Sequence, residues 1–146
     1  MNTSEPDPEP ETPAAQLRVA LARAVRRIRA ERVVEDLADG QFSVLAYLDR
    51  NGPATPGELA GFERVQPPSI TRTLAGLAGR GLVTRSAHPD DGRQVIVSLT
   101  AEGARTVRDT RLRRDTWLAA RLAELDPDER DLLARAADVL RRIADQ

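Results

Sequence analysis

Apolar residues recur at helical spacing in the first quarter and the last third of the chain. They fall three or four positions apart from Ala14 to about Asp36, again from Thr100 to about Glu124, and after Pro127. This period predicts long amphipathic helices. Their apolar stripes exceed what a core of this size needs, which favours a helical dimerisation region made of residues 14–36 and 100–146.

The segment between these regions predicts a helix-turn-helix. Residues 42–49 form a short apolar stripe that ends at Asn51-Gly52-Pro53. Thr55 followed by Glu58 three positions later is the capping-box pattern of a helix start. A second helix is expected from Pro67 to about Arg80. The short interval 61–66 requires the two helices to pack at a large angle.

After Gly81 the apolar period changes to that of strands. The stretches 82–86 and 94–99 read as two short strands around the polar tip Ala-His-Pro-Asp-Asp-Gly-Arg. The pattern therefore predicts a mainly α protein with a small two- or three-stranded antiparallel sheet. Residues 41–99 would form a winged helix-turn-helix within a single domain, 14–146. The acidic, Pro-rich residues 1–13 are expected to form a disordered tail.

Composition removes several classes of site. The chain has no cysteine and one histidine, His88, so it offers no thiol chemistry and a poor zinc ligand set. We expect no metal, no cofactor and no enzymatic activity, because neither a catalytic constellation nor a phosphate-binding glycine loop is present. No apolar run is long enough to span a membrane, which favours a cytoplasmic protein.

The net charge of −1 hides an uneven distribution. Glu5, Asp7, Glu9 and Glu11 lie in the first fifteen residues, so the remainder carries 22 bases against 23 − 4 = 19 acids, a balance of +3. Every base is arginine, which pairs with phosphates and guanine edges in a forked geometry. The lack of lysine is more simply explained by genomic base composition.

One face of the predicted second helix suits a DNA groove. A helical wheel buries Ile70, Leu74 and Leu77 and leaves small residues on the opposite face, with Arg72 as its one charge. Such a face can approach bases in the major groove closely. An ordinary solvated surface arginine is the alternative for Arg72. The candidate reading residues are Gln66, Pro68, Ser69, Thr71 and Arg72.

The tip of the predicted wing supplies a second candidate contact. Arg93 follows a tight turn at Asp91-Gly92 and can reach an adjacent minor groove. Asp91 would hold the guanidinium instead of touching phosphate. A plain hairpin tip with a surface ion pair is the alternative. His88 is interpreted as a solvated loop residue.

These motifs together resemble the MarR family of transcriptional regulators. The resemblance runs from about Phe42 to Gly103 and rests on Thr71-Arg72, Gly81-Leu82-Val83, Asp91-x-Arg93 and Leu99-Thr100-x-x-Gly103. It implies a homodimer that binds a pseudo-palindromic double-stranded DNA operator, usually as a repressor.

The resemblance also implies release of DNA by a small phenolic or anionic effector bound between the dimerisation helices and the winged domain. Oxidant and metal sensing are disfavoured by the absent cysteines and single histidine. Gln66 stands where the family more often has Ser, Thr or Asp, so weaker capping is expected there. A winged-helix module that binds proteins without specific DNA binding is the alternative function.

Overall fold

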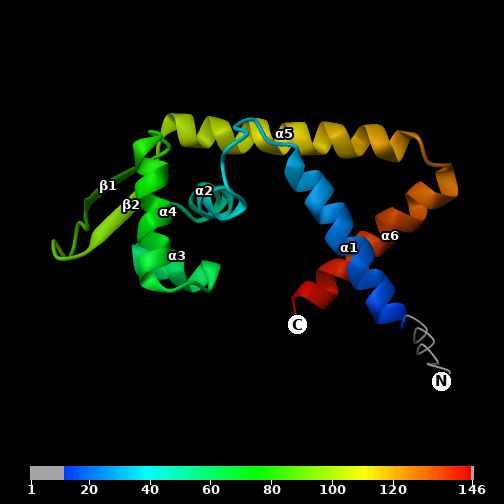
Figure 1. Cartoon of the computed structure of the whole chain (residues 1–146), viewed down its shortest axis with the longest axis horizontal. Coiled ribbons are helices and arrows are strands. Elements are labelled where there is room, and N and C mark those ends of the chain that lie inside the picture. The colour runs from blue at the N-terminus through cyan, green and yellow to red at the C-terminus, as the bar shows by residue number, and fades with distance from the viewer. Residues whose placement is uncertain (1–11, 146) are drawn as a thin grey trace, which may run out of the picture.

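The computed structural model of the chain describes residues 12–145 (Figure 1). The expected tail therefore lies mostly outside the described residues, and Thr12 already caps the first helix. Within these residues the chain forms six helices and one hairpin, in the order α1 (Pro13–Ala30), α2 (Asp39–Asn51), α3 (Pro56–Glu63), α4 (Pro67–Gly79), β1 (Val83–Ala87), β2 (Val95–Leu99), α5 (Ala101–Ala123) and α6 (Pro127–Ala144). The predicted fold class is confirmed.

The first two helices differ from the sequence prediction at their junction. α1 ends at Ala30, about six residues early, and α2 begins at Asp39, before the predicted Phe42. The cause is Leu37, which is 3% exposed and reaches the core only if the chain turns between the two helices. Arg32 stabilises this turn by donating to the carbonyl oxygens of Arg29 (3.2 Å) and Leu37 (2.8 Å).

Capping residues set most of the other helix starts, as predicted. The hydroxyl of Thr100 accepts the Gly103 N–H (3.0 Å) and donates to the Gly81 carbonyl (2.7 Å), which joins the start of α5 to the end of the helix-turn-helix. Asp126 and Glu129 form the predicted capping box of α6. These local bonds satisfy amides that have no partner inside their helix.

The hydrophobic core lies in the winged domain, between α2, α3, α4, the hairpin and the first half of α5. The hairpin is antiparallel with Val83 opposite Leu99 and Arg85 opposite Val97. Ala54 adds a single bridge to Val97, so the sheet has two strands and no full third one. The fully buried members include Val44, Leu45, Leu59, Leu74, Leu77, Val97 and Val107.

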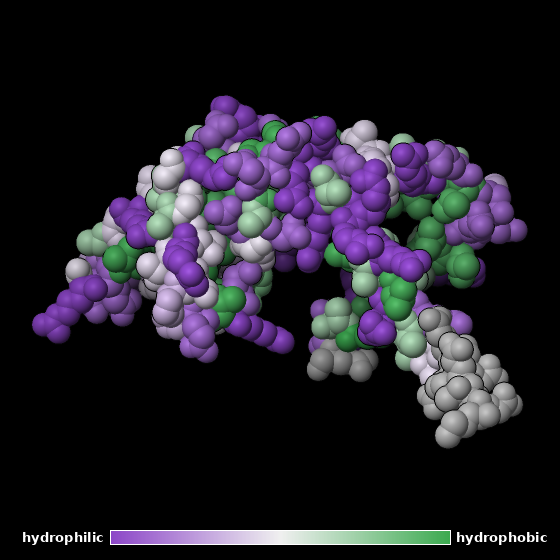
Figure 2. Space-filling model, viewed as in Figure 1, coloured by the Kyte–Doolittle hydropathy of each residue, from purple (hydrophilic) through white to green (hydrophobic). Residues whose placement is uncertain are grey.

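Helix α5 connects this core to the two terminal helices. It runs along the top of Figure 1 with the winged domain at one end, while α1 and α6 extend from the other part. Neither α1 nor α6 contains a buried residue in the single chain. Figure 2 shows apolar surface on these helices and on the far end of α5. The exposed apolar side chains there are Leu17, Leu21, Val25, Leu118, Leu132, Leu133, Val139 and Ile143.

Candidate nucleic-acid interface

The first helix of the helix-turn-helix is positioned by a complete capping box. Thr55 Oγ1 accepts the Glu58 N–H (3.2 Å), and Glu58 Oε2 accepts the Thr55 N–H (2.7 Å). The bond from the Thr55 backbone, followed by that from its hydroxyl, lowers the pKa of the Glu58 carboxyl. The carboxylate therefore stays ionised in the positive first turn of α3.

The turn between α3 and α4 contains the one non-glycine residue with a left-handed backbone in the described chain. Arg64 has φ 53° and ψ 44°, and its N–H donates back to the end of α3. A side chain in this region costs free energy, and a left-handed residue is a common way to end a helix. The side chain of Arg64 is exposed beside the start of α4. Sequence reasoning missed this residue, because an arginine carries no signal for a left-handed turn.

Helix α4 has the two faces that its sequence predicts. Ile70, Leu74 and Leu77 are buried against the core. On the outer side Arg72 is exposed. The small residues Ala75 and Gly79 share this face and project little from the helix. The C-terminal end of the helix is closed by the left-handed Gly81 (φ 71°).

The other predicted reading residues gather at the start of α4. Gln66, Pro68 and Thr71 are exposed, and Ser69 is half-buried. Gln66 occupies the N-cap position without a side-chain capping bond, as expected. The Thr71 hydroxyl donates to the Pro67 carbonyl (2.9 Å), so only its lone pairs are available to a ligand.

The wing places Arg93 at an exposed tip, with a different role for Asp91 from the one expected. The Asp91 carboxylate accepts the backbone N–H of Arg93 (3.1 Å) and so orders the turn instead of gripping the guanidinium. The N–H of His88 donates to the Gln94 carbonyl (2.8 Å), while its ring Nδ1 accepts the Asp90 N–H (3.1 Å). His88 is therefore part of the loop structure.

Positive charge accumulates on this half of the winged domain. Residues 64–99 hold five arginines and two aspartates, a balance of +3 in a chain of net charge −1. Of the arginines only Arg80 forms an ion pair within the described residues. The others are exposed and lack an acidic partner in the part of the chain that the structure describes: Arg64, Arg72, Arg85 and Arg93. Arg85, on β1, is a second cation that the sequence analysis did not single out.

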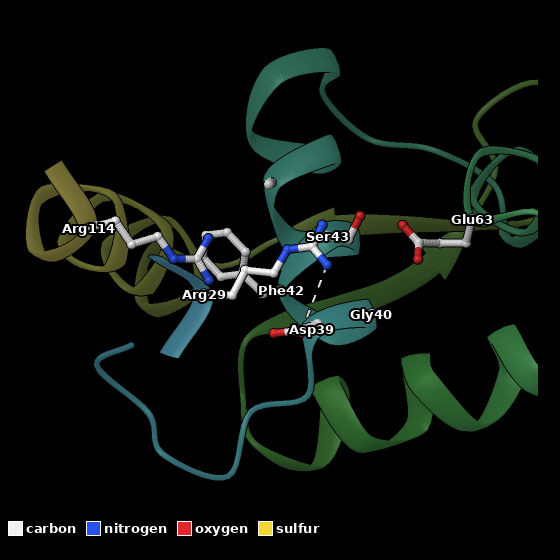
Figure 3. A pocket seen from close by; sticks show the side chains of 8 residues that line it. Arg29, Asp39, Gly40, Phe42, Ser43, Glu63 and Arg114 are labelled. Carbon is white, nitrogen blue, oxygen red and sulfur yellow. Dashed lines mark ion pairs between the residues drawn. The ribbon is translucent and has the colours of Figure 1, made fainter. Parts of the chain in front are cut away.

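A cavity of about 330 Å³ lies between the winged domain and the arm, which comprises α1, α6 and the second half of α5 (Figure 3). Arg114 of α5 stacks over the ring of Phe42, with its guanidinium carbon 4.3 Å from the centroid. Arg29 of α1 faces Asp39 across the opening at 4.0 Å, and Glu63 of α3 lines the far side. Partial burial lowers the pKa of the Arg114 guanidinium. The cavity thus combines an aromatic surface with two arginines and two carboxylates.

Across residues 12–145 no group of three or more His, Cys, Asp or Glu side chains is arranged to hold a metal ion. In the same span, none of the helices has the length and apolar character that a membrane crossing requires.

Comparisons with known proteins agree with this geometry. The model of the MarR family matches residues 37–95. An HTH-type transcriptional regulator of Mycobacterium tuberculosis is 44% identical over 133 residues, which cover 91% of this chain and 93% of the relative. The HTH-type transcriptional repressor YetL of Bacillus subtilis is 28% identical and covers 74% of this chain and 66% of its own. A solved structure from Pseudomonas aeruginosa, described as a candidate transcriptional regulator, is 37% identical with a TM-score of 0.82, covering 91% of this chain and 94% of that one.

Proposed function

Because this chain belongs to the MarR family and is a DNA-binding transcriptional regulator, we propose that it is a repressor that binds a pseudo-palindromic operator as a homodimer. The observation that carries the proposal is the set of exposed arginines without an internal acidic partner on the recognition helix and wing. Cations left free by the fold are available to neutralise phosphates.

The recognition helix α4 would enter the major groove with its N-terminal half. Arg72 would fork onto a guanine edge or grip a phosphate, since it is the only charge on a face of small residues. Pro68 and the half-buried Ser69 permit close approach, and Gln66 and Thr71 supply polar groups beside the first turn. Arg93 would enter the neighbouring minor groove from the wing tip, with Asp91 ordering its backbone.

A second copy of the chain would cover the apolar faces of α1, α6 and the end of α5. A helix with no buried residue gains little from its apolar stripe in a single chain. Self-association of these faces would set the two recognition helices at a fixed separation, which a pseudo-palindromic operator mirrors.

Repression is supported by the name of one relative, the HTH-type transcriptional repressor of Bacillus subtilis. A winged-helix module for protein binding remains the second candidate. The four exposed arginines favour DNA, because their charge in a protein interface would need a matching acidic surface on the partner.

The cavity between arm and winged domain would receive a small effector with an aromatic ring and an anionic group. The ring would lie near Phe42, and the anion would pair with Arg114 or Arg29. Benzoate and 4-hydroxybenzoate are suitable probes. We expect either compound to weaken DNA binding by the protein, and Arg114→Ala to reduce that response; unchanged DNA binding at millimolar concentrations of both probes would remove this part of the proposal.

Fluorescence anisotropy with DNA from upstream of the protein's own gene tests the main proposal. We expect nanomolar binding that weakens steeply with salt. Arg93→Ala removes one cation from the DNA interface of each protomer. The magnitude of the slope of log K for DNA binding against log salt concentration should therefore fall by roughly 0.9 per protomer, or about 1.8 for the dimer. Arg72→Ala should also reduce the preference for operator over unrelated DNA.

Arg105→Ala is the matched control, since Arg105 is exposed on α5 and pairs with Glu102 of the same helix. It should leave both the affinity and the slope nearly unchanged. Binding that is equal for operator and unrelated DNA, or that ignores Arg72 and Arg93, would contradict the proposal.

A further inference from the structure

The C-terminal end of the recognition helix is tied to the segment that joins α1 to α2. Arg80, the C-cap of α4, donates from Nη1 to Asp36 Oδ1 (3.0 Å) and from Nη2 to Asp36 Oδ2 (2.8 Å). Nη2 also lies 3.3 Å from the Asp36 carbonyl oxygen. Such a forked pair restrains orientation as well as distance. It joins residues 44 positions apart in the chain.

The joining segment, residues 31–38, is itself held by hydrogen bonds to α5 and to α2. Arg114 of α5 donates to the Glu31 carbonyl (3.2 Å), which holds the start of the segment. Arg32 donates to the Leu37 carbonyl (2.8 Å) and to Asp39 (3.2 Å), and Leu37 is buried in the core. Asp36 therefore projects from a braced segment instead of a free loop.

A second contact lies one turn before Arg80 in α4, at Gly76. A Cβ atom on Gly76 would come within 2.8 Å of Gln41 Nε2, so the glycine lets this side chain lie against the helix. Gln41 Oε1 also accepts the Ala38 N–H (3.1 Å), which connects the same joining segment to the start of α2. The C-terminal half of α4 thus rests on the joining segment and α2.

Arg80 differs from the other arginines of this region. It is the one among residues 64–99 that forms an ion pair in the described chain, and it lies at the end of α4 opposite to Gln66 and Ser69. Its side chain is 33% exposed. The pair lowers the pKa of the Asp36 carboxyl and raises that of Arg80, so both stay charged at neutral pH. An arginine held in this way is not free to bind phosphate.

We propose that Asp36 and Arg80 form a clamp that sets the angle of the recognition helix relative to the dimerisation arm, and that both are positioning residues for operator binding. The inference rests on the proposed function. In a dimer the arm fixes the separation of the two recognition helices, and the clamp transmits this position to α4 itself.

A double-mutant cycle on the full-length protein tests the clamp. Asp36→Asn, Arg80→Gln and the double variant are compared for binding to operator and to unrelated DNA by anisotropy. Losing an exposed ion pair of good geometry changes an equilibrium constant by about two- to fivefold. A dimer loses the pair at both half-sites, so its operator affinity should fall by about four- to twenty-five-fold. The double variant should lose no more than either single variant, because the three proteins lack the same interaction.

Two further readouts separate positioning from other roles. Affinity for unrelated DNA and the salt slope should stay unchanged, since no phosphate contact is removed. If Arg80 bound phosphate instead, Arg80→Gln would reduce the slope, whereas Asp36→Asn would not weaken binding. Arg105→Gln, which breaks the Glu102–Arg105 pair on α5, is the control for losing a surface ion pair.

The outcomes also separate the clamp from the proposed function. Absence of operator preference in the unmodified protein overturns the proposed function. Operator affinity that stays within about twofold of the unmodified protein in all three variants overturns the clamp alone. Since the Asp36 side chain is 77% exposed, Asp36→Asn is expected to fold, and circular dichroism confirms that the folded proteins are compared.

Discussion

Replacing Gly103 with alanine should destabilise the junction between the wing and α5. Gly103 is buried in the first turn of α5. A Cβ atom there would collide with the carbonyl oxygen of Leu82 and would lie 2.7 Å from Leu99 Cδ1. The Leu82 carbonyl is backbone and accepts the Thr100 N–H (3.1 Å), so it cannot move away without weakening that bond.

The expected loss in the free energy of unfolding has three contributions, of which two destabilise the protein and one stabilises it. Overpacking of a tight site costs about 1–3 kcal/mol. Weakening one backbone hydrogen bond adds about 1 kcal/mol, and alanine's better helix propensity returns about 1 kcal/mol. The free energy of unfolding should therefore fall by roughly 2 kcal/mol.

Urea unfolding followed by circular dichroism, at one fixed protein concentration, measures this change. Gly61→Ala is the matched control, because Gly61 is in the C-terminal half of α3 and a Cβ atom there meets nothing within 4 Å. The free energy of unfolding of that variant should rise by up to about 1 kcal/mol. Equal midpoints for the two variants would refute the reasoning about the Leu82 contact. The same displacement should shift the wing and weaken operator binding.

Three more substitutions have calculable outcomes. Thr110→Val should stabilise the chain by about 1 kcal/mol, because the buried Thr110 hydroxyl lacks a hydrogen-bond partner among the described residues; a loss in the urea midpoint would show that the hydroxyl is satisfied in the dimer. Thr100→Val removes the cap of α5 and the bond to the Gly81 carbonyl, which should cost about 1–2 kcal/mol in the same assay. Glu58→Gln should make the free energy of unfolding depend less on pH below about pH 5. The pKa of Glu58 is lowered by Thr55, so its contribution is present above the unfolded pKa of 4.5 and is lost as pH falls through the lower folded value; melting curves from pH 3 to 6 check this, and identical slopes would contradict it.

The element boundaries that sequence reasoning placed well are those controlled by neighbours in the chain. Thr55, Thr100 and Asp126 begin helices in the structure as predicted, because a capping hydroxyl or carboxylate acts on amides only three residues away. The two strands of the wing lie within about one residue of their predicted ranges, since alternation with period two is also a local signal.

The predictions that failed needed information from distant parts of the chain. The apolar spacing of α1 continues past Ala30, yet the helix stops there because Leu37 must reach a core formed by later residues. The predicted Asp91–Arg93 side-chain contact is replaced by a bond to the Arg93 backbone, which depends on the geometry of the turn.

Residue types and their periods alone determined that the chain is a winged helix-turn-helix, that Arg72 and Arg93 are candidate contacts, and that thiol chemistry is excluded. Tertiary structure decided which arginines contact other side chains of the chain and which are exposed. Arg80 is held by Asp36, 44 residues away, and Arg114 packs on Phe42, whereas Arg64 and Arg85 are left exposed. The physical reason is that a sequence states how many charges a chain carries, but pairing depends on distances of 3–4 Å that exist only after the helices have packed.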